Sequence, residues 1–220
     1  MDDTTDKLQN IQSKLTLYYG DWSQELPEQT MVVKYLKGHE KVLELGGNIG
    51  RNSLVIASIL NNDTNLVTLE SDVTIAQRLE INRDLNNMNF HVESSALSNR
   101  KLIQRGWDTI PSDTLHTGFN WVNTITLDEL KTKYQIEFDT LVLDCEGAFY
   151  YILKDMPEIL NNINLIIMEN DYYDISHKNY VDEILTTNNF YVDYTGDGTE
   201  TGASHFQCCR NFYEVWKKQV

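Results

Sequence analysis

Residues 41–50 read Lys-Val-Leu-Glu-Leu-Gly-Gly-Asn-Ile-Gly and constrain the fold more than any other segment. They form a short apolar stretch that ends in an acidic, glycine-rich turn, and the largely apolar residues 52–60 follow at once. Glycine allows the backbone to turn sharply and to approach a ligand closely. The N–H groups at the start of a following helix would face that ligand. The segment therefore predicts a strand–turn–helix unit that binds a nucleotide or a related cofactor.

The chemistry of this turn narrows the choice of cofactor. Nicotinamide dinucleotide sites use Gly-x-Gly-x-x-Gly, but Asn48 occupies the position of the middle glycine. That glycine lets the backbone reach a diphosphate, and Glu44 would be a poor neighbour for a diphosphate. A carboxylate suits the ammonium group of S-adenosylmethionine, which also carries a sulfonium. We therefore expect the turn, including Gly46, Gly47 and Gly50, to hold this cofactor.

A second acid supports this interpretation. Residues 66–69 form a short apolar stretch followed by Glu70. It lies about 20 residues beyond the glycine turn, where a strand–helix–strand unit places a carboxylate on ribose hydroxyls. One ionised carboxylate can accept hydrogen bonds from two neighbouring hydroxyl groups. The alternative is that Glu44 and Glu70 are merely solvated at strand ends, but two such acids flanking a glycine turn favour a cofactor site.

Composition and charge argue against several classes of protein. The chain has 220 residues and a formal net charge of −15, without a basic cluster of the kind that binds nucleic-acid phosphates. No apolar run approaches the ~20 residues of a membrane span, and the acidic N-terminus is unlike a secretory signal. The three cysteines indicate neither a disulfide framework nor a metal site. We expect one cytoplasmic domain over 1–220, with a helical lead-in at 1–38 and the core at 39–220.

Strand-like and helix-like stretches alternate through that core. Residues 100–123 are expected to be loop-rich, and a closing hairpin is expected at the chain's end. Such alternation predicts an α/β fold with a doubly wound, mainly parallel sheet. The expected strands are 42–45, 66–70, 90–93, 140–144, 165–169, 190–194 and 212–216, and the expected helices are 28–37, 52–60, 75–85, 127–134, 148–156 and 180–186.

Four acids fall at the predicted carboxyl ends of strands: Glu44, Glu70, Asp144 and Glu169. Ligands in doubly wound sheets bind outside these ends of the strands. Acids that are only solvated would not favour that edge, so the pattern predicts one acidic ligand site.

The chain resembles the FkbM family of class I S-adenosylmethionine-dependent methyltransferases. The resemblance is carried by residues 42–50, 69–72, 95–98, 126–130 and 143–148. It implies a Rossmann-like seven-stranded sheet with an antiparallel last strand and helices on both faces. It also implies methyl transfer to a hydroxyl oxygen, often on a sugar or a polyketide-like metabolite.

The same resemblance implies roles for individual residues. Asp144 would lie beside the transferred methyl group, and Glu70 would hold the ribose. Two departures from the family pattern are Glu44, where Asp is common, and Phe149, where Glu is common. The remaining implied contacts are Glu44, Gly46, Asn48 and Gly50 around the methionine part, Ser95 and Ala96 beside the adenine, and Ser71 nearby.

Methyl transfer to a hydroxyl needs a base or a metal, because such a hydroxyl is too weak an acid to ionise alone. Asp144 and Glu146 would point the same way in extended geometry, and clustered carboxylates raise one another's pKa. Alternatively, Glu146 is an acid that favours the start of the next helix. His205, in a long polar loop, is another candidate base, or only a polar surface group.

A metal is the second route to an activated hydroxyl. Asp144, Glu169 and Asn170 would bring three oxygen ligands from adjacent strand ends, which suits Mg²⁺ or another divalent cation. Without a metal, Glu169 would contact substrate hydroxyls or water.

The sequence therefore favours an O-methyltransferase that acts on a sugar, a glycan or another small hydroxylated metabolite. A nicotinamide-dependent oxidoreductase and a catalytically inactive binding protein are the alternatives. We expect a small-molecule or glycan partner and neither nucleic acid nor membrane, and a homo-oligomer stays open. No motif identifies the acceptor.

Overall fold

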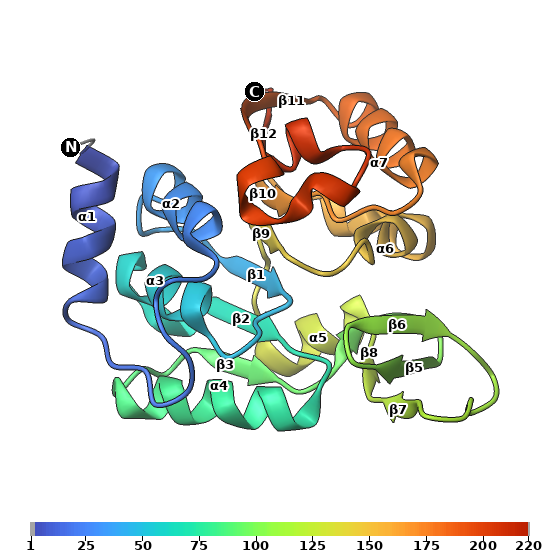
Figure 1. Cartoon of the computed structure of the whole chain (residues 1–220), viewed down its shortest axis with the longest axis horizontal. Coiled ribbons are helices and arrows are strands. Elements are labelled where there is room, and N and C mark those ends of the chain that lie inside the picture. The colour runs from blue at the N-terminus through green and yellow to red at the C-terminus, as the bar shows by residue number, and fades with distance from the viewer. Residues whose placement is uncertain (1–2, 220) are drawn as a thin grey trace.

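A seven-stranded sheet forms the centre of the computed structural model, which describes residues 3–219 (Figure 1). The strand order is β11-β12-β10-β9-β1-β2-β3. The strands are β1 (Val42–Leu45), β2 (Leu66–Leu69), β3 (His91–Glu93), β9 (Thr140–Leu143), β10 (Leu165–Glu169), β11 (Phe190–Gly196) and β12 (Tyr213–Lys218). Pairing is parallel from β3 to β10, and β12 runs antiparallel between β10 and β11. The predicted sheet with its antiparallel last strand is confirmed.

The central strands are short and apolar because both of their faces are covered. Every residue of β1, β2 and β9 is buried, as expected for parallel strands between layers of helices. The only ionisable residue within these three strands is Glu44, which is 2% exposed. Its burial within a strand means that its side chain faces a covering helix rather than the open end of the sheet.

The direction of the crossovers places the helices on both faces. Connections from β1 to β2 and from β2 to β3 step one way along the sheet, and the connection from β9 to β10 steps the other way. Since such crossovers are right-handed, α3 and α4 cover one face and α6 covers the other. The helices that follow core strands are α3 (Arg51–Ile59), α4 (Val73–Leu85), α6 (Phe149–Asp155) and α7 (Ile175–Thr187).

This reversal creates a switch point between β1 and β9. Their backbones are paired in register from Val42 opposite Thr140 to Leu45 opposite Leu143. A crevice opens outside the carboxyl ends of strands at such a point, because the chain leaves the two strands toward opposite faces. The fold therefore directs a ligand to the glycine turn after β1 and to the segment after β9.

Two helices precede the core, where the sequence predicts a helical lead-in. They are α1 (Asp3–Gln12) and α2 (Leu26–Tyr35). The two helices pack together, and α2 also contacts α3, β10 and β12. The start of α2 therefore lies near the carboxyl end of the sheet. Figure 1 shows these helices beside α3.

Residues 100–123, predicted to be loop-rich, also contain strands that the sequence did not predict. They form a second, antiparallel sheet with the order β6-β5-β7, built from β5 (Leu102–Arg105), β6 (Asp108–Pro111) and β7 (Asn120–Val122). All four residues of β6 are exposed, so the segment lacks the apolar alternation that marks a half-buried strand. A two-stranded pair of β4 (Ala96–Leu97) and β8 (Thr124–Ile125) connects it to the core.

Local signals account for the remaining elements. Thr126 and Glu129 form a reciprocal capping box at the start of α5 (Leu127–Tyr134). The connection between β11 and β12 contains three 3₁₀ turns, at Thr199–Thr201, Ala203–His205 and Cys209–Asn211. Two further 3₁₀ turns are Asp63–Asn65 and Pro157–Leu160. Among residues 3–219, no helix combines the length and the apolar character that crossing a membrane requires.

Candidate functional site

A cavity of about 740 Å³ lies at the carboxyl end of the sheet, around the switch point. Its wall includes the glycine turn after β1, the residues that follow β2 and β9, and the last residue of β10. The small sheet, α6 and the start of α2 close its other sides. The volume lies in the range of 300–1,000 Å³ that small-molecule and cofactor sites occupy.

Most of the residues predicted for the site lie on this wall. The structure brings nine of them together from five segments far apart in the sequence, which is why the strand-end pattern pointed to one site. They are Gly46, Asn48, Glu70, Ser71, Ser95, Ala96, Asp144, Glu146 and Glu169.

Glu44 does not lie on the wall of this cavity, contrary to the expectation that it meets the methionine part of a cofactor. As the penultimate residue of β1 it points at α3, where it accepts hydrogen bonds from Asn52 Nδ2 at 3.1 Å and from the Ser53 hydroxyl. Burial raises the pKa of Glu44 to about 7, against the hydrogen bonds from Ser53 and Thr68. Its place beneath the turn indicates a supporting role.

Gly47 and Gly50 are also beneath the turn rather than on the cavity wall. A Cβ at Gly47 would overlap the side chain of Thr68, and one at Gly50 would lie 3.0 Å from Leu79. These glycines allow α4 and β2 to pack closely against the turn. The structure therefore gives Gly47 and Gly50 a packing role beneath the turn, and their contact with a cofactor stays a prediction.

Asn48 shapes the turn where a dinucleotide site would have glycine. Its backbone is left-handed, with φ of 46°, a conformation that asparagine tolerates better than most residues. Its side chain accepts a hydrogen bond from the N–H of Ile49 at 2.9 Å and donates one to Glu25 at 3.0 Å. Asn48 thus ties the turn to the segment before α2.

Glu70 occupies the place predicted for a ribose-binding carboxylate. One of its oxygens accepts a hydrogen bond from the N–H of Asn48 at 2.9 Å, and the other accepts from the N–H of Asp72 at 2.8 Å. Burial raises the pKa of Glu70, and these two backbone donors oppose that shift. Because each carboxylate oxygen has a second lone pair, Glu70 can still accept hydrogen bonds from a ligand in the cavity.

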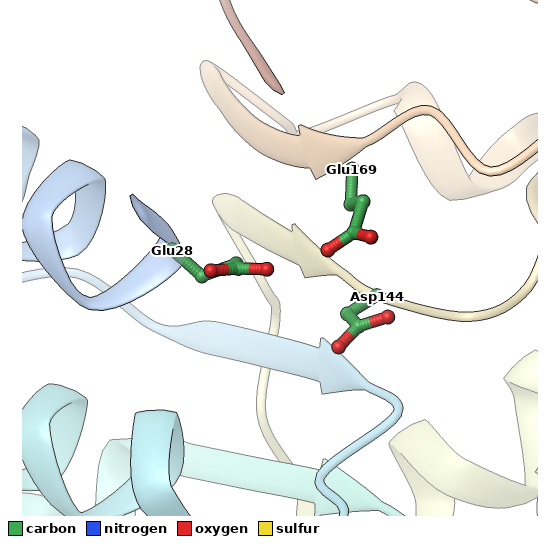
Figure 2. Close-up of side chains that lie close together, drawn as sticks. All are labelled: Glu28, Asp144 and Glu169. Atoms are coloured by element: carbon green, nitrogen blue, oxygen red, sulfur yellow. The ribbon is translucent and has the colours of Figure 1, made fainter. Parts of the chain in front are cut away.

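Three carboxyl groups converge at the side of the cavity nearest α2 (Figure 2). Glu28 lies in the first turn of α2, Asp144 follows β9, and Glu169 ends β10. One carboxylate oxygen from each lies within 4.8 Å of the others. Figure 2 shows their side chains pointing toward one another. Such a group of oxygens can surround one cation.

Asn170, the third predicted metal ligand, does not line the cavity, and its role as a ligand stays a prediction. Asn170 comes directly after β10. Its side-chain amide donates to the carbonyl of Asn211 at 2.7 Å. Glu28 stands in its place. The sequence held one signal of the burial of Glu28. It is three and four residues before the buried Met31 and Val32, and therefore lies on the apolar face of the predicted helix.

The three carboxyl groups carry an unrelieved electrostatic cost. Burial first, and then the neighbouring acids Asp171 and Glu28, raise the pKa of Asp144 well above its usual range. Burial and the nearby Glu28 and Asp144 also raise the pKa of Glu169. In residues 3–219, Glu28 Oε2 and Asn52 Oδ1 are buried without a hydrogen-bond partner. A positively charged ligand would relieve both costs.

Asp144 and Glu146, the predicted pair of acids, both line the cavity, but the backbone between them is not an extended strand. Strand β9 ends at Leu143, and Glu146 has a left-handed backbone with φ of 52°. Burial and the nearby Asp108 raise the pKa of Glu146, and His205 opposes this shift. Glu146 also raises the pKa of Asp144, after burial and three other acids, but Asp144 is not among the groups that shift the pKa of Glu146.

His205 is not on the cavity wall, contrary to its prediction as a base. It is exposed, and its Nδ1 lies 3.1 Å from the carbonyl oxygen of Gly202. Its ring packs on Phe206 at a centroid distance of 4.1 Å. The 3₁₀ turn at Ala203–His205 therefore holds the ring beside the cavity rather than inside it.

Acidic groups dominate the cavity as a whole. Among the described residues that line it, Arg100 is the one basic side chain, and Asp155 already accepts from its Nε at 2.5 Å and from Nη2 at 2.7 Å. The lining acids are Glu25, Glu28, Glu70, Asp144, Glu146, Asp155, Glu169 and Glu200. Sequence reasoning missed Glu25, Glu28 and Glu200, and also Trp107 and Tyr151, because none of them stands in a motif.

No protein-family model matches the chain, and no curated protein matches it. Several solved structures are similar to it. The O-methyltransferase TomG from Streptomyces achromogenes, in complex with S-adenosylmethionine, is 15% identical with a TM-score of 0.56, and the match covers 100% of this chain and 91% of that one. An O-methyltransferase from Bacillus cereus, in complex with S-adenosylhomocysteine, is 14% identical with a TM-score of 0.53, over 98% and 90% of the two chains.

A third similar structure is that of a protein whose name gives a different kind of methylation target. It is the ribosomal protein L11 methylase from Lactobacillus delbrueckii subsp. bulgaricus, 11% identical with a TM-score of 0.54, over 89% of this chain and 80% of that one. At these identities the likeness concerns the fold. The chain therefore has the Rossmann-like α/β fold of class I S-adenosylmethionine-dependent methyltransferases.

Proposed function

We propose that the protein is an S-adenosylmethionine-dependent methyltransferase that transfers the methyl group to a hydroxyl oxygen of a sugar, a glycan or another small hydroxylated metabolite. The observation that carries this proposal is the acid-lined cavity at the switch point between β1 and β9. S-adenosylmethionine is a cationic nucleoside, and buried carboxyl groups without counter-ions favour a ligand of that charge. The fold shared with methyltransferases supports the same conclusion.

The cofactor would lie across the glycine turn. Its ribose hydroxyls would donate to Glu70, which retains free lone pairs toward the cavity. Its adenine would lie beside Ser71, Ser95 and Ala96, which line the wall beyond β2 and β3. The ammonium group would meet the carboxyl groups of Glu28, Asp144 and Glu169. Each of these contacts uses a residue on the cavity wall.

The residues around Asp144 would supply the chemistry of transfer. Bound S-adenosylmethionine supplies an electrophilic methyl group on a sulfonium. The acceptor oxygen would form a bond to that carbon while the S–CH₃ bond broke and its electron pair stayed on sulfur. Asp144 or Glu146 accepts the hydroxyl proton, and a raised pKa makes a carboxylate a stronger base. The walls of the cavity align the acceptor with the methyl group, which supplies much of the rate enhancement.

A divalent cation is a further part of this proposal. Glu28, Asp144 and Glu169 provide three oxygen ligands, and Asn52 Oδ1 is an unpaired oxygen on the small cavity behind them. Mg²⁺ and Ca²⁺ prefer such ligands. A bound divalent cation would polarise an acceptor hydroxyl. The same oxygens could instead hold the cofactor's ammonium group, so the two occupants are separated by experiment.

Titration calorimetry tests the cofactor. S-adenosylmethionine and S-adenosylhomocysteine should bind, and NAD should not. Glu70→Gln should weaken binding about tenfold or more, because hydrogen bonds to a charged group contribute ~1.5–3 kcal/mol. Glu80→Gln is the matched control, since Glu80 is exposed on α4. If neither S-adenosylmethionine nor S-adenosylhomocysteine gives a heat of binding, the proposal is refuted. Binding of NAD in their place would favour an oxidoreductase.

Transfer of labelled methyl groups to soluble glycans and small polyols tests the reaction. Asp144→Asn should abolish turnover, and surviving turnover would contradict the role of Asp144. Activity lost in EDTA and restored by Mg²⁺ would establish the metal. In that case Glu28→Gln should raise the Mg²⁺ concentration needed for activity, whereas Glu80→Gln should not.

Nucleic acid is not a proposed acceptor. The net charge of −15 and the acidic cavity would repel a phosphate backbone. A small uncharged acceptor meets no such barrier.

A further inference from the structure

The small sheet presents one face to the cavity. In the hairpin of β5 and β6, Leu102 pairs with Pro111 and Gln104 pairs with Thr109. All four of these residues line the cavity. Residues directly opposite in an antiparallel pair share a face, so the inner face of this sheet is a wall of the site. Figure 1 shows the sheet as a separate unit beside the main sheet.

Trp107 stands at the tip of that hairpin. The turn between β5 and β6 consists of Gly106 and Trp107, with Gly106 at φ of 58°. Trp107 lines the cavity, yet 58% of its side chain is exposed to solvent. An exposed indole on the wall of a cavity offers a flat apolar surface on which a ligand can stack. A second aromatic residue on the cavity wall is Tyr151 of α6.

The charge of this end of the cavity limits what can stack there. Asp108 follows Trp107 in sequence and acts on Glu146 strongly enough to raise its pKa, so the tip of the hairpin lies close to the proposed catalytic acids. Arg100 is paired with Asp155. No lysine or histidine among the described residues lines the cavity. An anionic acceptor would therefore lack a free cation and face several acids.

We infer that the inner face of the small sheet and Trp107 form the acceptor subsite, and that this subsite takes an uncharged, hydroxyl-bearing ring. The inference rests on the proposed methyl transfer and specifies its acceptor. The flat face of the ring stacks on the indole of Trp107, and the amide of Gln104 and the hydroxyl of Thr109 bond to its hydroxyl groups. A sugar ring and a phenol share this chemistry, whereas a sugar phosphate does not.

Trp121 provides a matched control on the same sheet. It pairs with Ile103, so it lies on the outer face, away from the cavity, and 49% of it is exposed. Trp107→Ala and Trp121→Ala therefore remove equivalent exposed indoles from opposite faces. Circular dichroism and thermal unfolding of both variants would establish that each is folded.

The experiment uses saturation-transfer NMR on protein loaded with S-adenosylhomocysteine. The probes, at millimolar concentrations, are methyl β-D-glucopyranoside, catechol, phenyl β-D-glucopyranoside and glucose 1-phosphate. The neutral ring probes should bind, and Trp107→Ala should weaken the better one about tenfold, while Trp121→Ala should leave it unchanged. Whether the glucoside or catechol binds better identifies the source of the ring.

Several outcomes would overturn the inference. The ring probes could bind Trp107→Ala as tightly as wild type, or lose as much affinity for Trp121→Ala as for Trp107→Ala. The protein could also prefer glucose 1-phosphate, or bind none of the neutral probes. Failure of the proposed function has a different signature, because S-adenosylhomocysteine itself would then not bind. Both indole variants should retain wild-type affinity for S-adenosylhomocysteine by calorimetry.

Discussion

Replacing Glu44 with glutamine should stabilise the protein at alkaline pH and have little effect at acidic pH. Glu44 is 2% exposed and accepts hydrogen bonds from Asn52 and Ser53. Glutamine has the same shape, its oxygen can accept from Asn52, and its amide can donate to the Ser53 hydroxyl. The substitution therefore removes a buried charge without removing the packing.

The magnitude follows from the pKa of the carboxyl group. Burial raises the pKa of Glu44 from 4.5 to about 7, so the folded protein binds more protons than the unfolded chain between these values. Stability therefore falls as pH rises through this window and is constant above it. At 1.36 kcal/mol for each pKa unit, ionised Glu44 costs the fold about 3 kcal/mol. Other buried acids are common to both proteins and cancel in the difference.

Urea unfolding of ligand-free wild type and Glu44→Gln, followed by tryptophan fluorescence, measures this cost. The advantage of the variant should grow by about 2.5 kcal/mol between about pH 5 and pH 8. A difference that does not change with pH, or that favours wild type at high pH, would refute the reasoning. Glu44→Gln should also keep its affinity for S-adenosylmethionine, because Glu44 lies beneath the turn; a loss as large as that of Glu70→Gln would contradict that location.

Three further predictions concern stability and are measured by thermal or urea unfolding. Thr126→Ala should cost about 1 kcal/mol through loss of the capping box, and Thr126→Ser should restore most of it. Gly46→Ala should be strongly destabilising, because its Cβ would overlap a backbone carbonyl. Gly106→Ala, which also has positive φ but open space, should cost only about 1 kcal/mol; equal losses would contradict the overlap. Lys178→Met should cost about 3–5 kcal/mol, because it leaves Glu214, 3% exposed, without its 3.1 Å partner; an unchanged midpoint would contradict this.

Much of the core followed from local sequence alone. Buried parallel strands are continuous apolar runs, so β1, β2, β9 and β10 could be located within a residue or two. The hydroxyl and carboxyl pair at Thr126 and Glu129 marked the start of α5. The closing hairpin of β11 and β12 was visible as two aromatic-rich stretches. Each of these signals lies within a few residues of the element it defines.

The errors arose where direction, rather than position, was at issue. Glu44 and Asn170 both stand next to predicted strand ends, and neither lines the cavity: strand side chains alternate, and these two side chains bond to Asn52 and Asn211. The register that decides this alternation depends on pairing with strands far along the chain. The small sheet was missed because its strands are exposed and lack apolar alternation.

The sequence by itself determined the sheet, the glycine turn and the acid after β2, since these depend on short-range spacing and composition. Only the tertiary structure decided that Glu28, more than a hundred residues from its partners, joins Asp144 and Glu169. It likewise decided that Trp107 faces the cavity while Trp121 does not. The physical reason is that a site at a switch point is assembled by crossovers, which bring distant segments to one edge of a sheet and leave no local pattern.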